Sequence, residues 1–209
     1  MKSSSIRRRD IATTAIIVLV IACCVVFVDR PVAEWSHRVF RPTKVFTYSA
    51  ILLAQLDWLL GVMFGVLIAT GVLRGRGRRS PWIDRLFNAT LGGALGVVAA
   101  LVLKYAIGRS QADPLFLEQG IYTVHVLSGS KDYSAFPSAT MGASSGFLTA
   151  FVMDSKFEKS LGVLATLVLA FALISTDGHW LSDVIGGVVV GSLVGRLPVA
   201  RGVAQPYTR

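Results

Sequence analysis

Six stretches of mostly apolar residues divide the chain, and they limit its possible folds more than any other feature. The first, residues 11–28, contains 18 residues and no charged side chain, which approaches the ~20 residues that a helix needs to cross a bilayer. The others are residues 51–73, 88–105, 137–153, 161–176 and 184–194, and the last is predicted to begin at Trp180. A spanning segment must satisfy its own backbone hydrogen bonds. The pattern therefore predicts an all-α, polytopic membrane protein with a six-transmembrane-helix bundle.

Composition and charge also favour a membrane protein and give its orientation. Hydrophobic residues make up 53% of the chain and charged residues 16%, with a net charge of +9. The basic residues fall between the apolar runs rather than in one cluster, so no nucleic-acid partner is predicted. Fourteen of the 21 Lys and Arg residues lie in the N-terminal segment, in residues 74–87 and 154–160, and from Arg196 to the C-terminal end. Under the positive-inside rule, both termini are therefore cytoplasmic.

The same pattern divides the chain into three parts. Residues 1–44 are an N-terminal transmembrane helix with an interfacial segment, residues 45–197 a membrane core, and residues 198–209 a cytoplasmic tail. A cleavable signal peptide is the alternative for the first run, but Asp29 and Arg30 follow it where small residues would be expected. Glycines recur at four-residue spacing in the third, fourth and sixth runs, which predicts a compact bundle of these three helices.

Three polar regions from distant parts of the sequence reach the non-cytoplasmic membrane face in this topology. Lys104 ends the third run, residues 137–140 begin the fourth, and His179 and Asp183 lie between the fifth and sixth. If the turn there runs into helix, His179 and Asp183 share one face, and the carboxylate can hold the imidazole in one tautomer. The alternative is a histidine at the membrane interface with a helix-capping aspartate.

Residues 137–140 have the composition of an anion site. Pro137 suits the first turn of a helix. The backbone N–H groups of Ser138, Ala139 and Thr140 would then bind an anion with the help of the helix dipole. Lys104 adds a positive charge, and the Ser138 hydroxyl adds a donor. A phosphate held there could be attacked in line by a nucleophilic histidine.

At these positions the chain resembles the type-2 phosphatidic acid phosphatase (haloperoxidase-like) superfamily of integral membrane lipid phosphatases. The signature of that family is K-x6-R-P, then P-S-G-H, then S-R-x5-H-x3-D, and the matching segments here begin at Lys104, Pro137 and Ala172. The resemblance covers most of residues 45–195. It implies a nucleophile at His179, an orienting partner at Asp183, and phosphate ligands at Lys104 and Ser138.

The chain departs from this signature at three positions. The leaving-group acid, a histidine in the family, falls at Thr140, and the two phosphate-binding arginines fall at Gln111 and Leu173. Loss of a general acid typically costs ~10²–10⁴ in rate. Arg109 is predicted to reach the phosphate in place of the arginine missing at Gln111, against the alternative of an ordinary loop residue. We expect Gln111 and Ala139 to line the phosphate site as well.

These observations predict a membrane lipid-phosphate phosphatase, a phosphoric monoester hydrolase that acts on a phospholipid or polyprenyl phosphate through a phosphohistidine. The alternative is a catalytically impaired family member that binds a phosphorylated lipid or a membrane partner. The predicted location is the bacterial inner (plasma) membrane, with the site facing the periplasm or exterior. No metal or cofactor is predicted, because the nearby carboxylates and histidines do not make a ligand set.

Overall fold

The computed structural model describes residues 2–151 and 156–200, and most of these residues are helical. The long helices are α1 (Lys2–Cys23), α2 (Asp29–Phe40), α3 (Lys44–Gly75), α4 (Pro81–Ile107), α6 (Ala139–Ala150), α7 (Lys156–Ser175) and α8 (Leu181–Ala200). The short helical turns are η1 (Cys24–Val28), η2 (Ala112–Phe116), α5 (Leu117–Gln119) and η3 (Lys131–Tyr133). The described residues form no β-strand, which confirms the all-α prediction.

Helices occupy all six predicted membrane runs, but their lengths differ. Within the part of the chain that the structure describes, five segments are long and apolar enough to cross a membrane: Ala12–Phe40, Lys44–Gly75, Pro81–Ile107, Lys156–Ser175 and Leu181–Pro198. The exception is α6, whose 12 described residues rise only ~18 Å at 1.5 Å per residue. Several membrane-length helices are therefore present, and the count of six depends on α6, which packs between α4 and α8.

Glycines bring α4, α6 and α8 into backbone contact, as their four-residue spacing predicts. A Cβ on Gly92 of α4 would lie 2.6 Å from the carbonyl oxygen of Gly146 in α6. A Cβ on Gly195 of α8 would lie 2.5 Å from the same oxygen. Helices can approach this closely only where side chains are absent. These contacts place α6 at the centre of the bundle. The start of α6 also packs closely on α8, since a Cβ on Gly187 would lie 2.5 Å from the Ser138 carbonyl oxygen.

Replacing Gly96 of α4 with leucine is expected to lower the free energy of unfolding by about 3 kcal/mol, because even its Cβ would overlap the Gly142 backbone of α6. Gly61→Leu on α3 is the matched control, since a Cβ there meets nothing within 4 Å. Unfolding in detergent, followed by circular dichroism, measures both variants. Equal losses in the two proteins would contradict the packing described here.

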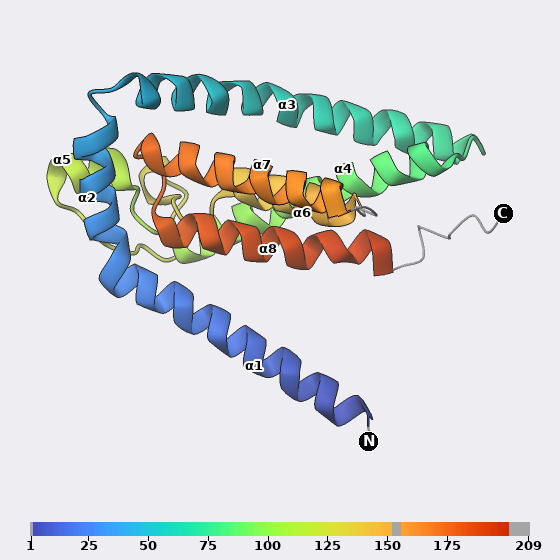
Figure 1. Cartoon of the computed structure of the whole chain (residues 1–209), viewed down its shortest axis with the longest axis horizontal. Helices are drawn as coiled ribbons and strands as arrows, with labels where there is room; N and C mark the ends of the chain where they lie inside the picture. Colours follow the sequence, from blue (N-terminus) through green and yellow to red (C-terminus); the bar gives the residue numbers. More distant parts are fainter. Residues whose placement is uncertain (1, 152–155, 201–209) are drawn as a thin grey trace.

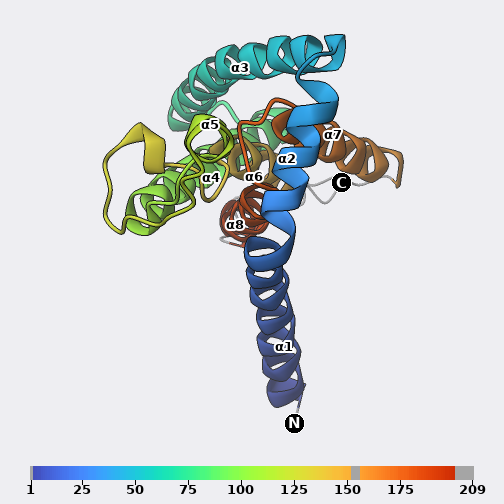
Figure 2. The same ribbon diagram turned by 90° about the vertical axis from the view of Figure 1, so that its left-hand side faces the viewer.

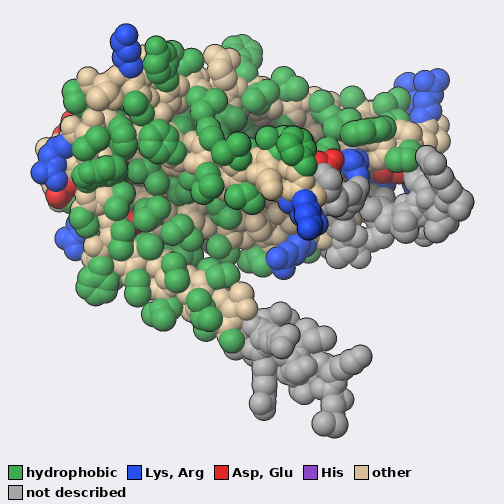
Figure 3. Space-filling model, viewed as in Figure 1, with side chains coloured by type: hydrophobic (Ala, Val, Ile, Leu, Met, Phe, Trp, Pro, Cys, Tyr) green, Lys and Arg blue, Asp and Glu red, His purple; other side chains and the backbone are tan. Residues whose placement is uncertain are grey.

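The outer surface of the bundle suits a lipid environment. Large hydrophobic side chains are exposed on α3 and α7, among them Ile68 and Leu167. Figure 3 shows hydrophobic side chains over the middle of the visible face, with Lys and Arg side chains gathered toward its two ends. An apolar band bordered by basic residues is typical of a membrane protein.

The N-terminal helix bends before it reaches α3. The bend contains the π-helical turn η1 and Pro31, which has no N–H to donate. Beyond it, α2 lies across the end of the bundle rather than along it (Figures 1 and 2). Asp29 and Ser36 are both buried on its inner face, seven residues apart. The predicted interfacial segment is thus largely a helix that covers one end of the molecule.

The two ends of the described chain lie away from α2. Figure 1 shows the start of α1, the turn between α3 and α4, and the end of α8 on one side of the molecule, with α2 and α5 on the other. This is the arrangement that an even number of spans produces. The assignment of the first side to the cytoplasm stays a prediction, and most of the predicted tail at 198–209 falls outside the described residues.

Candidate active site

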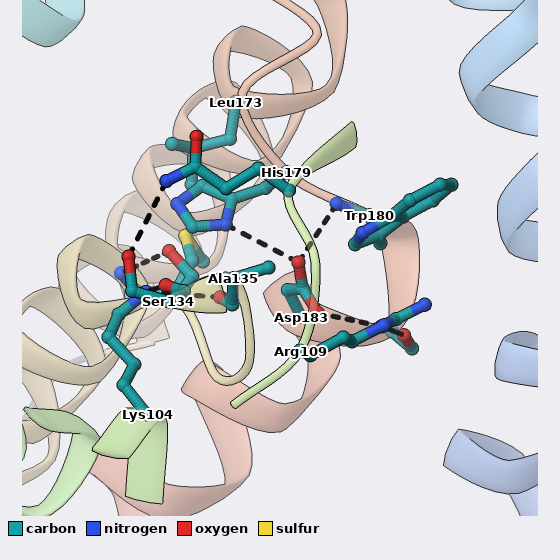
Figure 4. Close-up of polar contacts among 12 residues, drawn as sticks. Lys104, Arg109, Ser134, Ala135, Leu173, His179, Trp180 and Asp183 are labelled. Carbon is teal, nitrogen blue, oxygen red and sulfur yellow. Dashed lines mark hydrogen bonds and ion pairs between the residues drawn. The ribbon is translucent and has the colours of Figure 1, made fainter. Parts of the chain in front are cut away.

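The structure brings the three predicted polar regions together beneath α2. Lys104 comes from the last turn of α4, Ser138 from the start of α6, and His179 and Asp183 from the entry to α8. The Ser138 backbone N–H donates to the Asp183 carbonyl oxygen at 2.9 Å, which joins α6 to α8. In Figure 4, Lys104 points toward the loop at Ser134, and the His179 ring and Asp183 lie beyond that loop.

Asp183 contacts His179 and also caps a helix. His179 itself precedes the helix, because α8 begins at Leu181. The Asp183 Oδ2 lies 3.5 Å from His179 Nδ1 and accepts the Trp180 backbone N–H at 3.1 Å, which is the reciprocal half of a capping box. The two interpretations of this pair, orienting partner and helix cap, therefore describe one side chain. A separation of 3.5 Å is one that substrate binding can tighten.

A buried arginine holds the other oxygen of Asp183. Arg109 Nη1 donates to Asp183 Oδ1 at 2.7 Å and to Ser182 Oγ at 2.6 Å, and Nη2 donates to Asp29 Oδ2 at 2.7 Å and to the Tyr122 hydroxyl at 2.8 Å. Only 5% of the Arg109 side chain is exposed. Its donors are thus used inside the protein. The structure places Arg109 behind Asp183, rather than in the phosphate contact that we predicted.

Aromatic rings enclose this guanidinium. The Arg109 Cζ lies 5.0 Å from the centre of the Trp180 ring and 5.3 Å from that of Tyr122, close enough for cation–π attraction. Burial disfavours the charged guanidinium, but Asp183 and Asp29 outweigh it, so the pKa of Arg109 is raised. Burial also raises the pKa of the Tyr122 hydroxyl. Arg109 is therefore a fixed positive charge at the base of the site.

Lys104 and Gln111 hold the loop that precedes α6. Lys104 Nζ donates to the Ser134 carbonyl oxygen and, at 3.1 Å, to that of Ala135. The Gln111 amide donates to the Lys131 carbonyl oxygen at 2.8 Å and lies 3.4 Å from Ser134 Oγ. An ammonium group has three N–H donors and a primary amide two. Lys104 therefore keeps one donor for a ligand, whereas both donors of Gln111 have acceptors in the loop.

The start of α6 differs from our expectation. The helix begins at Ala139 with Ser138 as its N-cap, so Pro137 lies before the helix rather than in its first turn. The Ser138 N–H is already bonded to α8, and its hydroxyl accepts a helical N–H at 3.4 Å. The N–H groups of Ala139 and Thr140 come first in the helix and have no intrahelical carbonyl partner. These two N–H groups are the ones that an anion can use.

Two of the positions that depart from the family signature have apolar surroundings. Thr140 lines a cavity of about 420 Å³ between α3, α4, α6 and α7, and most of the lining is apolar. Leu173 is 4% exposed and packs in a cluster with Met141 and Val184. An arginine at position 173 would bring a charge into that cluster, which is costly without a partner. Leu173 therefore contributes apolar packing at a position where the family signature has an arginine.

A second polar cluster ties α2 and its C-terminal end to the turn that carries His179. His37 Nδ1 lies 2.9 Å from Asp177 Oδ2, and Arg41 Nη1 lies 3.5 Å from the same oxygen. Asp177 has a φ of 59°, a left-handed conformation that aspartate tolerates in turns. Burial raises the pKa of Asp177, although the hydrogen bond from His37 and the charge of Arg41 oppose this. The turn is thus held from the end of the molecule that α2 covers.

The sequence marks Asp29 only as the residue that ends the first apolar run, and its place in the site was missed. Its side chain is fully buried, and it accepts the Ser182 backbone N–H at 2.9 Å. The available signal was an acid directly after 18 uncharged, mostly apolar residues, since a charge at that position needs a partner within the protein. That partner, Arg109, lies 80 residues further along the chain and has no pattern that links it to Asp29.

Comparison with known proteins gives one family match. A family model described as the PAP2 superfamily matches residues 85–201, which is more than half of the 209 residues. The matched segment contains Lys104, Ser138 and His179, whereas α1, α2 and α3 precede it. No curated protein and no solved structure matches the chain.

Proposed function

The chain belongs to the PAP2 superfamily of type-2 phosphatidic acid phosphatases, and from this membership we propose that it hydrolyses the phosphate of a phospholipid or polyprenyl phosphate. Family membership supports phosphatase chemistry in general. The observation that supports a working site is the His179–Asp183 pair, 3.5 Å apart, next to the start of α6. The lipid substrate and the phosphohistidine are the further parts of the proposal.

In the proposed reaction, the His179 imidazole attacks the phosphorus, and the bond from phosphorus to the lipid oxygen breaks. Asp183 stabilises the positive charge that develops on the ring. Thr140 stands where the family has an acid but cannot supply a proton at neutral pH, so the departing alkoxide takes its proton from water. A second water then attacks the phosphohistidine and releases inorganic phosphate, which returns His179 to its starting state.

Four donors are available to bind the phosphoryl oxygens. Two are the N–H groups of Ala139 and Thr140 at the start of α6, where the helix dipole favours an anion. The third is the one N–H of the Lys104 ammonium group that does not bond to a loop carbonyl oxygen. The fourth is the Ser138 hydroxyl proton, because that hydroxyl only accepts in the helix cap. Preorganised donors of this kind each typically contribute ~10²–10³ in rate.

The cavity beside the site supports a lipid substrate. Among its lining residues only Thr90, Thr140 and Ser144 are polar, and Thr140 is two residues from Ser138. The cavity therefore begins next to the proposed phosphate site and continues between membrane-length helices. Its volume of about 420 Å³ is in the range of sites for small molecules. An acyl or isoprenoid chain is the apolar ligand that the surrounding membrane offers.

We also propose that the site faces the periplasm or exterior. The basic N-terminal segment, the turn between α3 and α4, and the end of α8 lie at the opposite end of the molecule (Figure 1). The positive-inside rule puts that end in the cytoplasm. The proposal treats α6 as the sixth span, which keeps both termini on one side.

The activity is tested by phosphate release from the purified protein in detergent. Phosphatidic acid, lysophosphatidic acid and a polyprenyl diphosphate serve as substrates, with glycerol phosphate as the water-soluble comparison. We expect release from a lipid substrate, little from glycerol phosphate, and none above background from His179→Ala. Equal release from the unmodified protein and from His179→Ala would show that His179 takes no part in the reaction. Equal rates with glycerol phosphate and with a lipid phosphate would show that the protein does not recognise the lipid chain.

A non-catalytic function is the second candidate. It is favoured by Gln111, whose amide donors are used within the loop, and by Leu173, which is buried in an apolar cluster. With one arginine position used for hydrogen bonds to the loop and the other for apolar packing, the site would bind a phosphorylated lipid or a membrane partner without turning it over. Clear His179-dependent release from the unmodified protein would reject this candidate.

A further inference from the structure

We infer that Asp29 of α2 is a positioning residue for the site. It holds the Asp183 carboxylate in place beside His179 and keeps Arg109 from fully neutralising the Asp183 charge. Asp29 does not touch the reacting atoms, and it acts through Arg109 and Ser182. The activity readout below rests on the proposed function, and a second readout is independent of it. The inference concerns a helix that lies outside the segment matched by the family model.

The contacts form a continuous path from α2 to the histidine. Asp29 Oδ1 accepts the Ser182 backbone N–H at 2.9 Å, and Oδ2 accepts the Ser182 hydroxyl at 2.5 Å and Arg109 Nη2 at 2.7 Å. The other guanidinium arm donates to Asp183 Oδ1 at 2.7 Å. Asp183 Oδ2 then lies 3.5 Å from His179 Nδ1. Asp29 and Asp183 are both fully buried, so little solvent screening interrupts this path.

The charges along this path explain why a second carboxylate is needed. Arg109 alone would neutralise Asp183, and a neutralised Asp183 would do little to stabilise a positive imidazole. With Asp29 present, one guanidinium is shared between two carboxylates, and the group keeps a net charge of −1 next to His179. The short contacts also fix the Asp183 carboxylate, which otherwise has only the Trp180 N–H to hold it.

Other contacts keep Asp29 in place. The Ser36 hydroxyl of α2 donates to the Ile174 carbonyl oxygen at the end of α7, at 2.7 Å. The Tyr122 hydroxyl, which accepts from Arg109, donates to the Val25 carbonyl oxygen of η1 at 2.7 Å. These bonds lie on both sides of Asp29 in the sequence. The bend at η1 and the crossing of α2 therefore place the Asp29 carboxylate at the base of the site.

The experiment compares the full-length protein with Asp29→Asn, Ser182→Ala and Glu34→Gln. Asp29→Asn removes the charge and nearly keeps the shape. Ser182→Ala removes the two hydroxyl contacts on the path, to Asp29 and to Arg109, without changing any charge. Glu34→Gln is the matched control, since Glu34 is an exposed acid of the same helix. Each protein is assayed for kcat and KM, and for the rate at which diethyl pyrocarbonate modifies His179, with the exposed His125 of the loop between α5 and η3 as internal reference.

For Asp29→Asn we expect kcat to fall at least tenfold with KM changed less than twofold, because phosphate binding does not involve Asp29. We expect His179 to react with the reagent at least threefold faster than in the unmodified protein, since its ring is held less firmly, while His125 is unchanged. Ser182→Ala should show both effects more weakly, and Glu34→Gln neither.

Two results would overturn the inference. One is an Asp29→Asn protein with unchanged kcat and unchanged modification of His179. The other is a faster modification of His179 and His125 together, which would mean a general loosening of the fold. If the unmodified protein releases no phosphate, the proposed function fails, and the modification rates still decide the role of Asp29. If Asp29→Asn does not fold, Ser182→Ala decides it by the same two criteria.

Discussion

Replacing Arg109 with leucine is expected to lower the free energy of unfolding by about 3–5 kcal/mol, because it leaves two carboxylates buried without their shared partner. Asp29 and Asp183 are both fully buried, and Arg109 supplies a 2.7 Å contact to each. Leucine fills part of the space between Trp180 and Tyr122 but offers no donor. Unfolding in detergent, followed by circular dichroism at neutral pH, measures the loss.

The control for this prediction is Arg38→Leu, which removes an exposed arginine from α2 and should change stability by no more than about 0.5 kcal/mol. Arg109→Lys should fall between the two, since an ammonium keeps the charge but lacks the planar fork that reaches both carboxylates. An Arg109→Leu protein as stable as the Arg38→Leu protein would show that the buried network does not hold this end of the molecule.

The sequence predicted those parts of the fold that depend on periodic or local patterns. Apolar runs predicted helices at the right places, because a membrane helix must be apolar over its whole length. Glycines four residues apart within a helix, such as Gly92 and Gly96, predicted that α4, α6 and α8 touch, since close packing of backbones requires missing side chains. The approach of His179 and Asp183 was predicted from their separation of four residues, although His179 lies before the start of α8 rather than on its face. Each of these predictions rests on a pattern that is contained within one segment of the chain.

Features that depend on contacts between segments were not predictable in the same way. The buried carboxylate of Asp29 and the guanidinium of Arg109 meet only because α2 crosses the end of the bundle. Arg109 was predicted to be a phosphate ligand because it lies two residues before Gln111, where the family signature has an arginine, whereas the tertiary structure gives it two carboxylates. Pro137 was placed in a helix on propensity, and the capping of α6 by Ser138 starts the helix two residues later.

Replacing Thr140 with histidine is expected to raise kcat for a lipid phosphate about 10²-fold, the lower end of what a general acid supplies. Thr140 lies at the first turn of α6, where a side chain can reach the leaving oxygen of a phosphate bound by the same helix terminus. Its surroundings are the apolar cavity, which disfavours a charged imidazole. The gain should therefore be greater at about pH 5.5 than at about pH 8, where the ring has no proton to donate. Phosphate release at saturating substrate measures it.

Ser144→His is the matched control, since Ser144 lines the same cavity one helical turn further from the site. A histidine there meets the same apolar surroundings but is about 6 Å further along the helix from the phosphate, so no gain is expected. An equal gain from both variants would mean that the cavity, rather than a proton donor, limits the rate. The starting level also separates the two candidate functions. If the unmodified protein already releases phosphate and Thr140→His releases it faster, the chain is a slow phosphatase. If only Thr140→His releases phosphate, the unmodified protein binds the phosphorylated lipid but lacks the acid that protonates the leaving alcohol.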